Sequence, residues 1–485
     1  MATETTVLKE SLLEVSELSR NPTEMPSINE KNEIHHSLPE HLGPDPRLKK
    51  RSTMATVAGV AGNVMEWYDF AVFGYFSDII GDVFFPPQAG HAAIAESFAV
   101  FGGAFIMRPI GGMFMGYIGD TYGRKKALEL SIFLMAFPTF AMGCLPTYDQ
   151  VGWMSIVLLT VVRLMQGLSV GGQLMASLVY TIENAPRNRW GLHGSYVMSA
   201  ANCGTLLGGI VGYVLTTFLD DDQLHSWGWR LPFLAGILVS LSGLYLKYCV
   251  EEDSAHLDHL PEGAEVENPI KIAFSKKNRR SLMASALVPM LWSGGFYLCF
   301  VWMAIYMKDL VPGAPVPGAF AINSFSLFFS LCLTFPLSGL LSDYWGRKPV
   351  MILGASLMCF TGPVMVVLIS NGNPYIAFIA QSALGIYLAL WGAPMMAWLA
   401  ESFPPEARLT AVSIGYNIAQ AIAGGTSPVL ATVLVDQVGA YAPGAMLTVY
   451  GLLGLVGLYI APAPIDSIES RGIMHIGDTE NTILQ

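Results

Sequence analysis

The stretch GYIGDTYGRKKAL at residues 116–128 has a second copy in the chain, GLLSDYWGRKPVM at residues 339–351. Both copies follow a long apolar run and keep an aspartate, a glycine and an arginine at the same spacing. Two further stretches also match loosely, GLSVGGQLMASLVYTIENAP at 167–186 and GIYLALWGAPMMAWLAESFP at 385–404. The repeats indicate two copies of one unit in the same orientation, as in secondary transporters that bind substrate between their halves.

The composition indicates a protein whose surface faces lipid. The 485 residues are 53% hydrophobic and 13% charged, with a mean hydropathy of +0.48, whereas soluble domains carry about 25% charged residues. A membrane helix needs about 20 mostly apolar residues, and the chain has twelve such runs. They lie near residues 54–80, 92–117, 127–145, 152–181, 192–218, 229–250, 281–307, 318–341, 349–370, 374–399, 409–434 and 441–462.

The longest polar segment inside this apolar region separates the sixth and seventh runs. We therefore predict an all-α membrane protein of twelve transmembrane helices in two six-helix halves, residues 54–250 and 281–462, joined by a linker at 251–280. The polar tails at 1–53 and 463–485 flank the halves. The N-terminal tail contains no apolar stretch typical of a cleaved signal peptide, and we expect it to be disordered.

The distribution of positive charge predicts the orientation, because loops retained in the cytoplasm are rich in Lys and Arg. One set of loops carries most of these residues: Arg47, Lys49, Lys50, Arg51, Arg124, Lys125, Lys126, Arg187, Arg189, Lys276, Lys277, Arg279, Arg280, Arg347, Lys348 and Arg408. The opposite loops carry few. Both termini and the linker are therefore expected in the cytoplasm, with the chain in the plasma membrane.

The repeated motif predicts a gate at the cytoplasmic end. Gly116 and Gly123 permit close packing and a tight turn, and Asp120 can pair with Arg124 or with a neighbouring helix end. Ordinary positive-inside charge explains the adjacent lysines but not the repeated spacing. The expected gating residues are Gly116, Asp120, Gly123, Arg124, Asp343, Gly346 and Arg347.

Three polar residues of the first apolar run, Asn63, Glu66 and Asp69, are spaced by three and form one stripe on a helix. Counted from Ser52, Glu66 lies about 21 Å and Asp69 about 25 Å along the helix, near or beyond the bilayer midplane. Two acids on one stripe repel when both are ionised, which favours proton uptake by one of them. Glu66 and Asp69 are therefore the candidate proton-coupling residues; the alternative is that they only neutralise an arginine.

Two arginines also lie inside apolar runs of the first half. Arg108 precedes Asp120 by 12 residues, about 18 Å along a helix, and Arg163 lies well inside the fourth run. Charges at such depth are costly, which favours a functional role over a structural ion pair. The span cores of the second half lack charges and offer aromatic groups instead, which suit a quaternary ammonium through cation–π attraction or simply pack.

Four stretches together resemble the metabolite:proton symporter family of the major facilitator superfamily. They are GNVMEWYDFAVFGY (62–75), FIMRPIGGMFMGYIGDTYGRKKAL (105–128), RLMQGLSVGGQ (163–173) and WGWRLPFL (227–234). The resemblance covers about residues 54–462 and implies the fold of that superfamily, transport by alternating access, and a role for Arg163 in substrate binding or proton coupling. The family usually has an acid where this chain has Gln173.

The resemblance implies a proton-coupled symporter of a small polar metabolite, such as proline, betaine or an organic acid. The candidate substrate-binding residues are Asn63, Arg108, Arg163, Gln173, Trp292, Tyr297 and Trp391. The sequence has no phosphate-binding loop and no metal-ligand spacing, so we expect no cofactor, no metal, no enzymatic activity and no nucleic-acid partner, and a monomer in the bilayer. A proton-independent facilitator and a non-transporting sensor are the alternatives.

Overall fold

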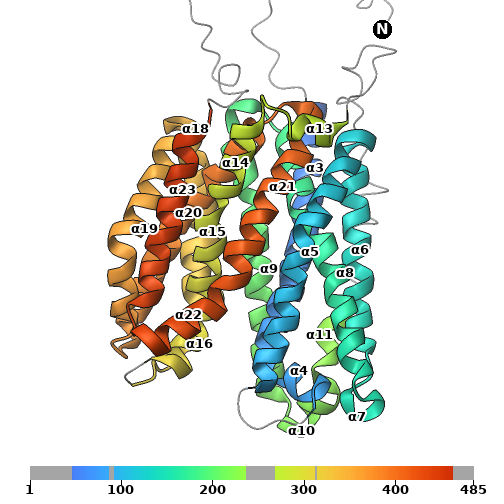
Figure 1. Cartoon of the computed structure of the whole chain (residues 1–485), viewed down its shortest axis with the longest axis vertical. Coiled ribbons are helices and arrows are strands. Elements are labelled where there is room, and N and C mark those ends of the chain that lie inside the picture. Colours follow the sequence, from blue (N-terminus) through green and yellow to red (C-terminus); the bar gives the residue numbers. More distant parts are fainter. Residues whose placement is uncertain (1–45, 87–91, 236–267, 312–313, 463–485) are drawn as a thin grey trace, which may run out of the picture. The chain divides into compact units, whose positions relative to one another are not determined.

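The computed structural model describes residues 46–86, 92–235, 268–311 and 314–462. The chain divides into two units, residues 1–51 and 52–485, and every described helix after the first long one lies in the second unit. Within the described residues every regular element is a helix (Figure 1). The predicted tails lie outside the described residues except for 46–53 at the start of the first long helix, and the predicted domain boundaries stay a prediction.

The described part of the first half contains five long helices, α3, α5, α6, α8 and α9, with short helical turns between some of them. Its elements are α3 (Pro46–Tyr75), α4 (Ser77–Phe84), α5 (Ala92–Tyr122), α6 (Arg124–Cys144), α7 (Tyr148–Val151), α8 (Met154–Glu183), η1 (Arg187–Arg189), α9 (Trp190–Phe218), α10 (Asp221–Gln223), η2 (Leu224–Gly228) and α11 (Arg230–Leu234).

The second half is more often interrupted, because several of its spans contain π-helical turns. Its elements are α13 (Pro269–Ala273), α14 (Arg279–Leu287), α15 (Pro289–Phe296), η4 (Tyr297–Trp302), α16 (Met303–Ile305), η5 (Tyr306–Leu310), α17 (Ala319–Leu327), η6 (Phe328–Cys332), α18 (Thr334–Trp345), α19 (Arg347–Ile369), α20 (Pro374–Glu401), η7 (Pro405–Ala407), α21 (Arg408–Ala419), η8 (Gln420–Gly424), α22 (Gly425–Val438) and α23 (Ala442–Ile460).

Nine helical segments of the described residues are long and apolar enough to cross a membrane. They correspond to the third, fourth, fifth and seventh to twelfth runs of the sequence. The first and second runs form α3 and α5, helices of 30 and 31 residues. α3 carries the buried acids Glu66 and Asp69, and α5 carries the buried Arg108. The sixth run begins with α11 and otherwise lies outside the described residues.

Glycines bring α5 and α8 into backbone contact, which fixes the depth of Arg108. An ideal Cβ on Gly171 would lie 2.1 Å from the carbonyl oxygen of Arg108, and one on Gly167 would lie 2.2 Å from that of Ala104. No side chain fits at such separations, so only glycine permits this crossing. Small residues at helix contacts are typical of membrane bundles, and here they place Arg108 directly against α8.

The two halves meet along two equivalent helix pairs, α5 with α21 and α9 with α18. Figure 1 shows α5 beside α21. A Cβ on Gly116 would lie 2.6 Å from Cα of Thr410, and one on Gly339 would lie 2.5 Å from the carbonyl oxygen of Gly191. Gly116 and Gly339 occupy the same position of the repeated motif, so the motif glycines permit the close approach of the halves.

Candidate functional site

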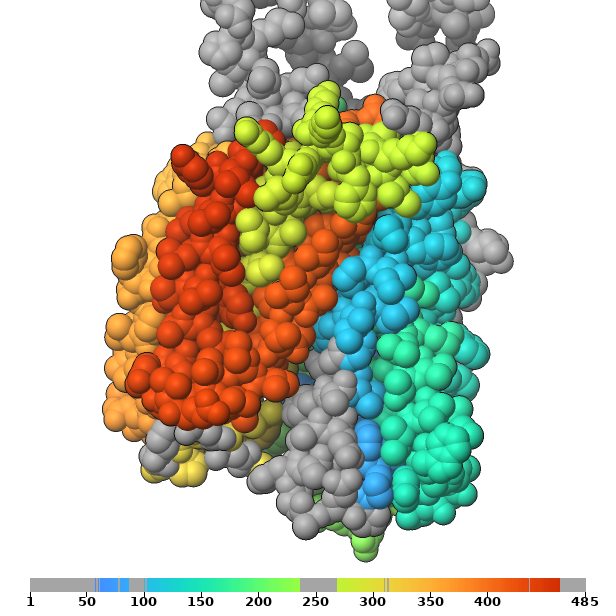
Figure 2. Space-filling model, in the orientation of Figure 1, coloured from blue at the N-terminus to red at the C-terminus, as the bar shows by residue number. Residues whose placement is uncertain are grey.

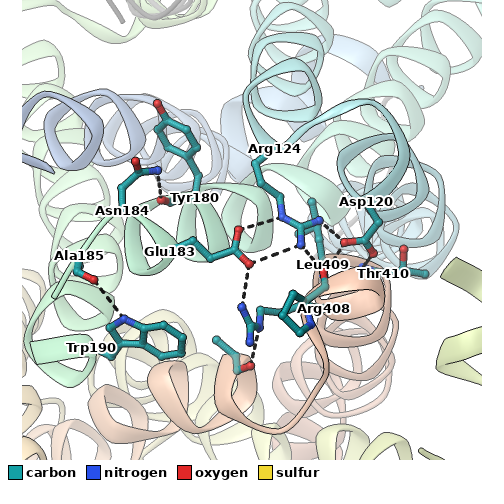
Figure 3. Close-up of polar contacts among 12 residues, drawn as sticks. Asp120, Arg124, Tyr180, Glu183, Asn184, Ala185, Trp190, Arg408, Leu409 and Thr410 are labelled. Carbon is teal, nitrogen blue, oxygen red and sulfur yellow. Dashed lines mark hydrogen bonds and ion pairs between the residues drawn. The ribbon is translucent and has the colours of Figure 1, made fainter. Parts of the chain in front are cut away.

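The first copy of the repeated motif forms a buried ionic cluster at one end of the bundle (Figure 3). The Arg124 side chain pairs with Asp120, four residues earlier. Its Nε also lies 3.1 Å from Oε2 of Glu183 at the end of α8, and its Nη2 donates to the carbonyl oxygen of Pro405 at 2.7 Å. Because Pro405 belongs to the second half, Arg124 joins the two halves.

Asp120 caps a helix of the opposite half. Its Oδ1 accepts a hydrogen bond from the backbone N–H of Leu409 at 3.2 Å, and its Oδ2 accepts one from that of Thr410 at 2.7 Å. These N–H groups lie in the first turn of α21, where a helix has unpaired donors and a partial positive charge. The carboxylate of α5 therefore stabilises the start of α21 only while the halves are together at this end.

The second copy repeats the arrangement in the reverse direction. Asp343 accepts hydrogen bonds from the backbone N–H groups of Gly191 and Leu192, at 2.8 and 2.9 Å, in the first turn of α9. Arg347 pairs with Asp343, and its Nη2 lies 2.9 Å from Oε1 of Glu401. Each half thus supplies one aspartate that caps a helix of the other.

One contact has no equivalent in the second copy. Nη1 of Arg408 lies 2.8 Å from Oε1 of Glu183, across the two halves. The equivalent position in the first half is Trp190, whose Nε1 donates to the carbonyl oxygen of Ala185 at 3.3 Å. The Arg408 guanidinium also lies 5.5 Å from the centre of the Trp190 ring. The ionic contact between the halves is therefore stronger at the cluster of Asp120 and Arg124 than at the cluster of Asp343 and Arg347.

The linker contributes to the same end of the bundle. Helix α13, which the sequence analysis placed within the linker, packs against α5, η7 and α21. In Figure 2 the yellow-green segment that contains α13 lies beside the orange segment that contains α21.

The motif glycines Gly123 and Gly346 immediately precede α6 and α19. They adopt positive φ angles of 108° and 92°, at which other residues would be strained.

The acidic stripe of α3 is fully buried, with Asn63, Glu66 and Asp69 each at 0% exposure. Oδ2 of Asp69 accepts hydrogen bonds from Arg163 Nη1 at 3.4 Å and from Gln166 Nε2 at 2.9 Å, both on α8. The Arg163 guanidinium lies 3.5 Å from the centre of the Phe73 ring. Asp69 and Arg163 thus form an ion pair inside the first half.

Glu66 has a different environment from Asp69. Within the described part of the chain, neither carboxylate oxygen of Glu66 has a hydrogen-bond partner. Arg108 is close enough to act on its charge, and Nε and Nη2 of Arg108 also lack partners among the described residues. The Arg108 guanidinium lies 5.0 Å and 4.3 Å from the ring centres of Phe70 and Phe105. The buried carboxyl group of Glu66 and the buried guanidinium of Arg108 therefore retain free hydrogen-bonding capacity.

The second half faces this pair with the turns η4 and η8. Tyr297, the first residue of η4, packs its ring 5.3 Å from that of Phe105 and interacts with the charges of Arg108 and Glu66. Gln420, the first residue of η8, donates to the Tyr416 hydroxyl at 2.7 Å. π-Helical turns are frequent at functional sites, and both of these lie where the second half meets Arg108.

The other predicted substrate-binding residues lie in packing contacts. Asn63 donates to Ser177 Oγ at 2.6 Å, and Gln173 donates to the carbonyl oxygen of Gly62 at 3.0 Å, so both tie α3 to α8. Trp391 donates to the carbonyl oxygen of Val288 at 3.1 Å, within the second half.

Trp292 packs its ring 5.4 Å from that of Phe296 and 5.1 Å from that of Phe335, beside the face that carries Tyr297. Of the predicted residues, the structure therefore brings Glu66, Arg108 and Tyr297 together. Across the described ranges, no group of three or more His, Cys, Asp or Glu residues could hold a metal ion.

Sequence reasoning did not identify Glu183 and Arg408 as members of the ionic cluster around Arg124. A signal was present, because Glu183 and Glu401 occupy the same position in the second pair of repeats, YTIENAP and WLAESFP. Gln166, which donates to both Asp69 and Thr139, was also missed. Its partner lies 97 positions away in the chain, and no spacing in the sequence indicates that contact.

Comparisons with known proteins identify the family of the chain. Residues 54–257 match the family model described as sugar (and other) transporter, and residues 317–474 match that of the major facilitator superfamily. The glycine betaine/proline/ectoine/pipecolic acid transporter OusA of Dickeya dadantii is 30% identical over 450 residues, 89% of each chain. The proline/betaine transporter of Escherichia coli K12 is 29% identical, over 85% of this chain and 83% of its own.

Solved structures share the fold at lower identity. The proton:xylose symporter XylE bound to 6-bromo-6-deoxy-D-glucose matches with a TM-score of 0.71 at 20% identity, over 87% of this chain and 99% of that one. The inward open conformation of XylE from E. coli matches with a TM-score of 0.62 at 21% identity, over 86% and 98%. The predicted family and fold are confirmed. The chain belongs to the major facilitator superfamily and, within it, to the family of proline/betaine transporters that its sequence motifs resemble.

Proposed function

We propose that the protein is a secondary transporter that moves a small polar metabolite with a carboxylate group together with protons. The observation that carries the proposal is that Glu66 and Arg108 are both buried, lie close enough to interact electrostatically and have unused hydrogen-bonding atoms. Isolated buried charges are costly unless a partner satisfies them. A proton and a substrate carboxylate are partners of the required kind.

The pair provides a physical route to coupling. An ionised Glu66 attracts Arg108, whereas a protonated Glu66 leaves the guanidinium available to a substrate carboxylate. Proton binding then raises substrate affinity, and by linkage substrate binding raises proton affinity by the same factor. One charge that crosses a potential of 100 mV carries about 2.3 kcal/mol, which is sufficient to drive accumulation.

The surroundings of Arg108 favour a zwitterionic substrate over an organic acid. The rings of Phe105 and Tyr297 border the guanidinium, and aromatic faces attract ammonium groups once water is excluded. Curated relatives are named for the transport of betaine and proline, which combine an ammonium and a carboxylate. An organic acid remains the second candidate, since Arg108 alone recognises a carboxylate.

The motif clusters supply the gate in this proposal. Alternating access requires the cytoplasmic ends of the halves to separate, which breaks the caps that Asp120 and Asp343 form and the Glu183–Arg408 ion pair. The protein then acts as a carrier rather than an enzyme.

We further propose that it works as a monomer, with both termini and the linker in the cytoplasm and with the chain in the plasma membrane.

Uptake measurements test the proposed function. Membrane vesicles that contain the protein should accumulate labelled proline or betaine when the outside is acidified, and a protonophore should abolish the accumulation. Vesicles without the protein are the control. Equilibration that ignores the pH gradient would instead identify a facilitator, and ligand binding without flux would identify a sensor.

The topology has a separate test. A tag placed after Gln485 or within residues 251–267 should be labelled by an impermeant reagent only after the cells are permeabilised, because the positive loops are expected in the cytoplasm. A tag in the loop at Asp220–Asp222, on the opposite side, is the positive control and should be labelled in intact cells. Labelling of the Gln485 tag in intact cells would contradict the orientation.

A further inference from the structure

Two cysteines from different halves of the carrier contact each other. Cys203 lies on α9 in the first half, and Cys332 ends η6 in the second half. Neither is in a disulfide, and the two thiols lie close enough to interact with each other. α9 and η6 also pack against each other, and neither thiol has a role in the proposed transport site.

The register of the two helices explains why these thiols meet. The start of α9 lies against the end of α18, since Asp343 accepts from Gly191, so the helices run antiparallel. The two helices approach each other closely at Gly339, where a Cβ would lie 2.7 Å from Cβ of Ser195. Cys332 lies seven residues before Gly339 and Cys203 eight residues after Ser195. Because the helices are antiparallel, both cysteines lie on the same side of the contact between Gly339 and Ser195, about 10–12 Å along their helices. This distance is two helical turns, so each cysteine lies on the helix face that contacts the other helix.

The two thiols of the pair differ in exposure within the bundle. Cys203 lies on the exposed surface of α9, whereas Cys332 is buried in the contact between the halves. The other described cysteines lack this combination: Cys144 is exposed at the end of α6, Cys299 is buried within η4, and Cys359 lies on α19. A disulfide needs Cα atoms within about 7 Å and facing Cβ atoms, which neighbouring residues on packed helices can provide.

We propose that peroxide oxidises Cys203 and Cys332 to a disulfide that joins the two halves and stops transport. One sulfur, as the thiolate, attacks the peroxide O–O bond and becomes a sulfenic acid, with release of one water. The second thiol attacks that sulfur, the S–S bond forms, and the hydroxyl leaves as a second water. The two thiols lose two electrons and two protons, and hydrogen peroxide is reduced to two waters.

The effect on transport follows from where the bond lies. α9 and α18 belong to opposite halves, and opening of the gate moves the start of α9 away from Asp343. A covalent bond two turns from the crossing prevents α9 from sliding or tilting on α18. This part of the proposal rests on the proposed transport function, whereas formation of the disulfide does not.

The experiment uses the full-length chain with a protease site inserted within residues 251–267. Vesicles are treated with hydrogen peroxide, cleaved, and separated by electrophoresis without reductant. We expect the two halves to migrate together after oxidation and apart after dithiothreitol. The initial uptake rate should fall in proportion to the linked fraction and recover with dithiothreitol.

Matched variants make the result specific. Cys203→Ser and Cys332→Ser should each abolish the linkage and make uptake insensitive to peroxide, whereas Cys144→Ser, which removes another exposed thiol, should behave like the parent. Absence of linkage in the parent, or linkage that persists in both pair variants, would overturn the disulfide. A fully linked carrier with unchanged uptake would overturn the block. Because electrophoresis measures the linkage directly, the experiment tests disulfide formation even if the protein transports neither proline nor betaine.

Discussion

Glu66→Gln is expected to abolish uptake against a gradient while exchange of substrate across the membrane continues. Glutamine keeps the size of the side chain but cannot ionise, so Arg108 stays available to the substrate in every state and the proton no longer moves with it. The uncoupled carrier then equilibrates its substrate without concentrating it. Measurement of pH-driven accumulation and of counterflow in the same vesicles separates the two activities.

Two further variants serve as a control and as a test of the other acid of α3. Glu129→Gln removes a carboxylate whose partner is Lys125, at 3.6 Å and away from Arg108, and should leave accumulation unchanged. Asp69→Asn leaves Arg163 without its buried counter-ion, which commonly costs about 3–5 kcal/mol, so we expect less folded protein. If Asp69→Asn instead folds normally and loses accumulation alone, while Glu66→Gln still accumulates substrate, the proton binds to Asp69.

Asp120→Asn is expected to slow transport sharply at near-normal membrane abundance. The asparagine keeps one acceptor for the start of α21 but loses the second and the charge that pairs with Arg124. Loss of a charge-assisted hydrogen bond costs about 1–3 kcal/mol, a shift of about 5- to 150-fold in the balance between closed and open states. Initial uptake rates, normalised to the amount of protein in the membrane, measure the effect.

Asp343→Asn should have the same effect in milder form, because the first copy retains the Glu183–Arg408 pair and its own caps. Asp149→Asn is the matched control, since Asp149 is an exposed acid of α7 with no contact to the gate. Wild-type rates in both Asp120→Asn and Asp343→Asn would show that the motif aspartates do not gate transport.

The sequence was sufficient to predict the fold and the pairing of the motif residues Asp120 and Arg124. Apolar runs have the length that the bilayer imposes, and the repeated spacing of Asp120 and Arg124 reflects contacts that both halves share. The partners of Asp120 could not be predicted in the same way. They are backbone N–H groups of Leu409 and Thr410, which any residue other than proline could supply, so no side-chain pattern indicates them.

The two acids of α3 illustrate a second limit. Their spacing predicts that Glu66 and Asp69 share one face of a helix, and both are buried. It does not distinguish their surroundings, because those depend on which residues of α5 and α8 lie opposite. Glycines at 167 and 171 bring the backbones of α8 and α5 together. In the folded bundle Arg163 pairs with Asp69, and Arg108 lies near Glu66.

The two aspartate caps form an isologous contact, in which a two-fold rotation axis relates the halves and each half presents the same surface to the other. Asp120 meets the helix start at Leu409, and Asp343 meets the equivalent start at Gly191. The symmetry fails where Arg408 replaces Trp190, because only Arg408 pairs with the opposite half's glutamate. We therefore expect the two contacts between the halves to separate one after the other. The contact of α9 with α18, capped by Asp343, should separate first, and the contact of α5 with α21, capped by Asp120, should separate second, so that the opening is asymmetric.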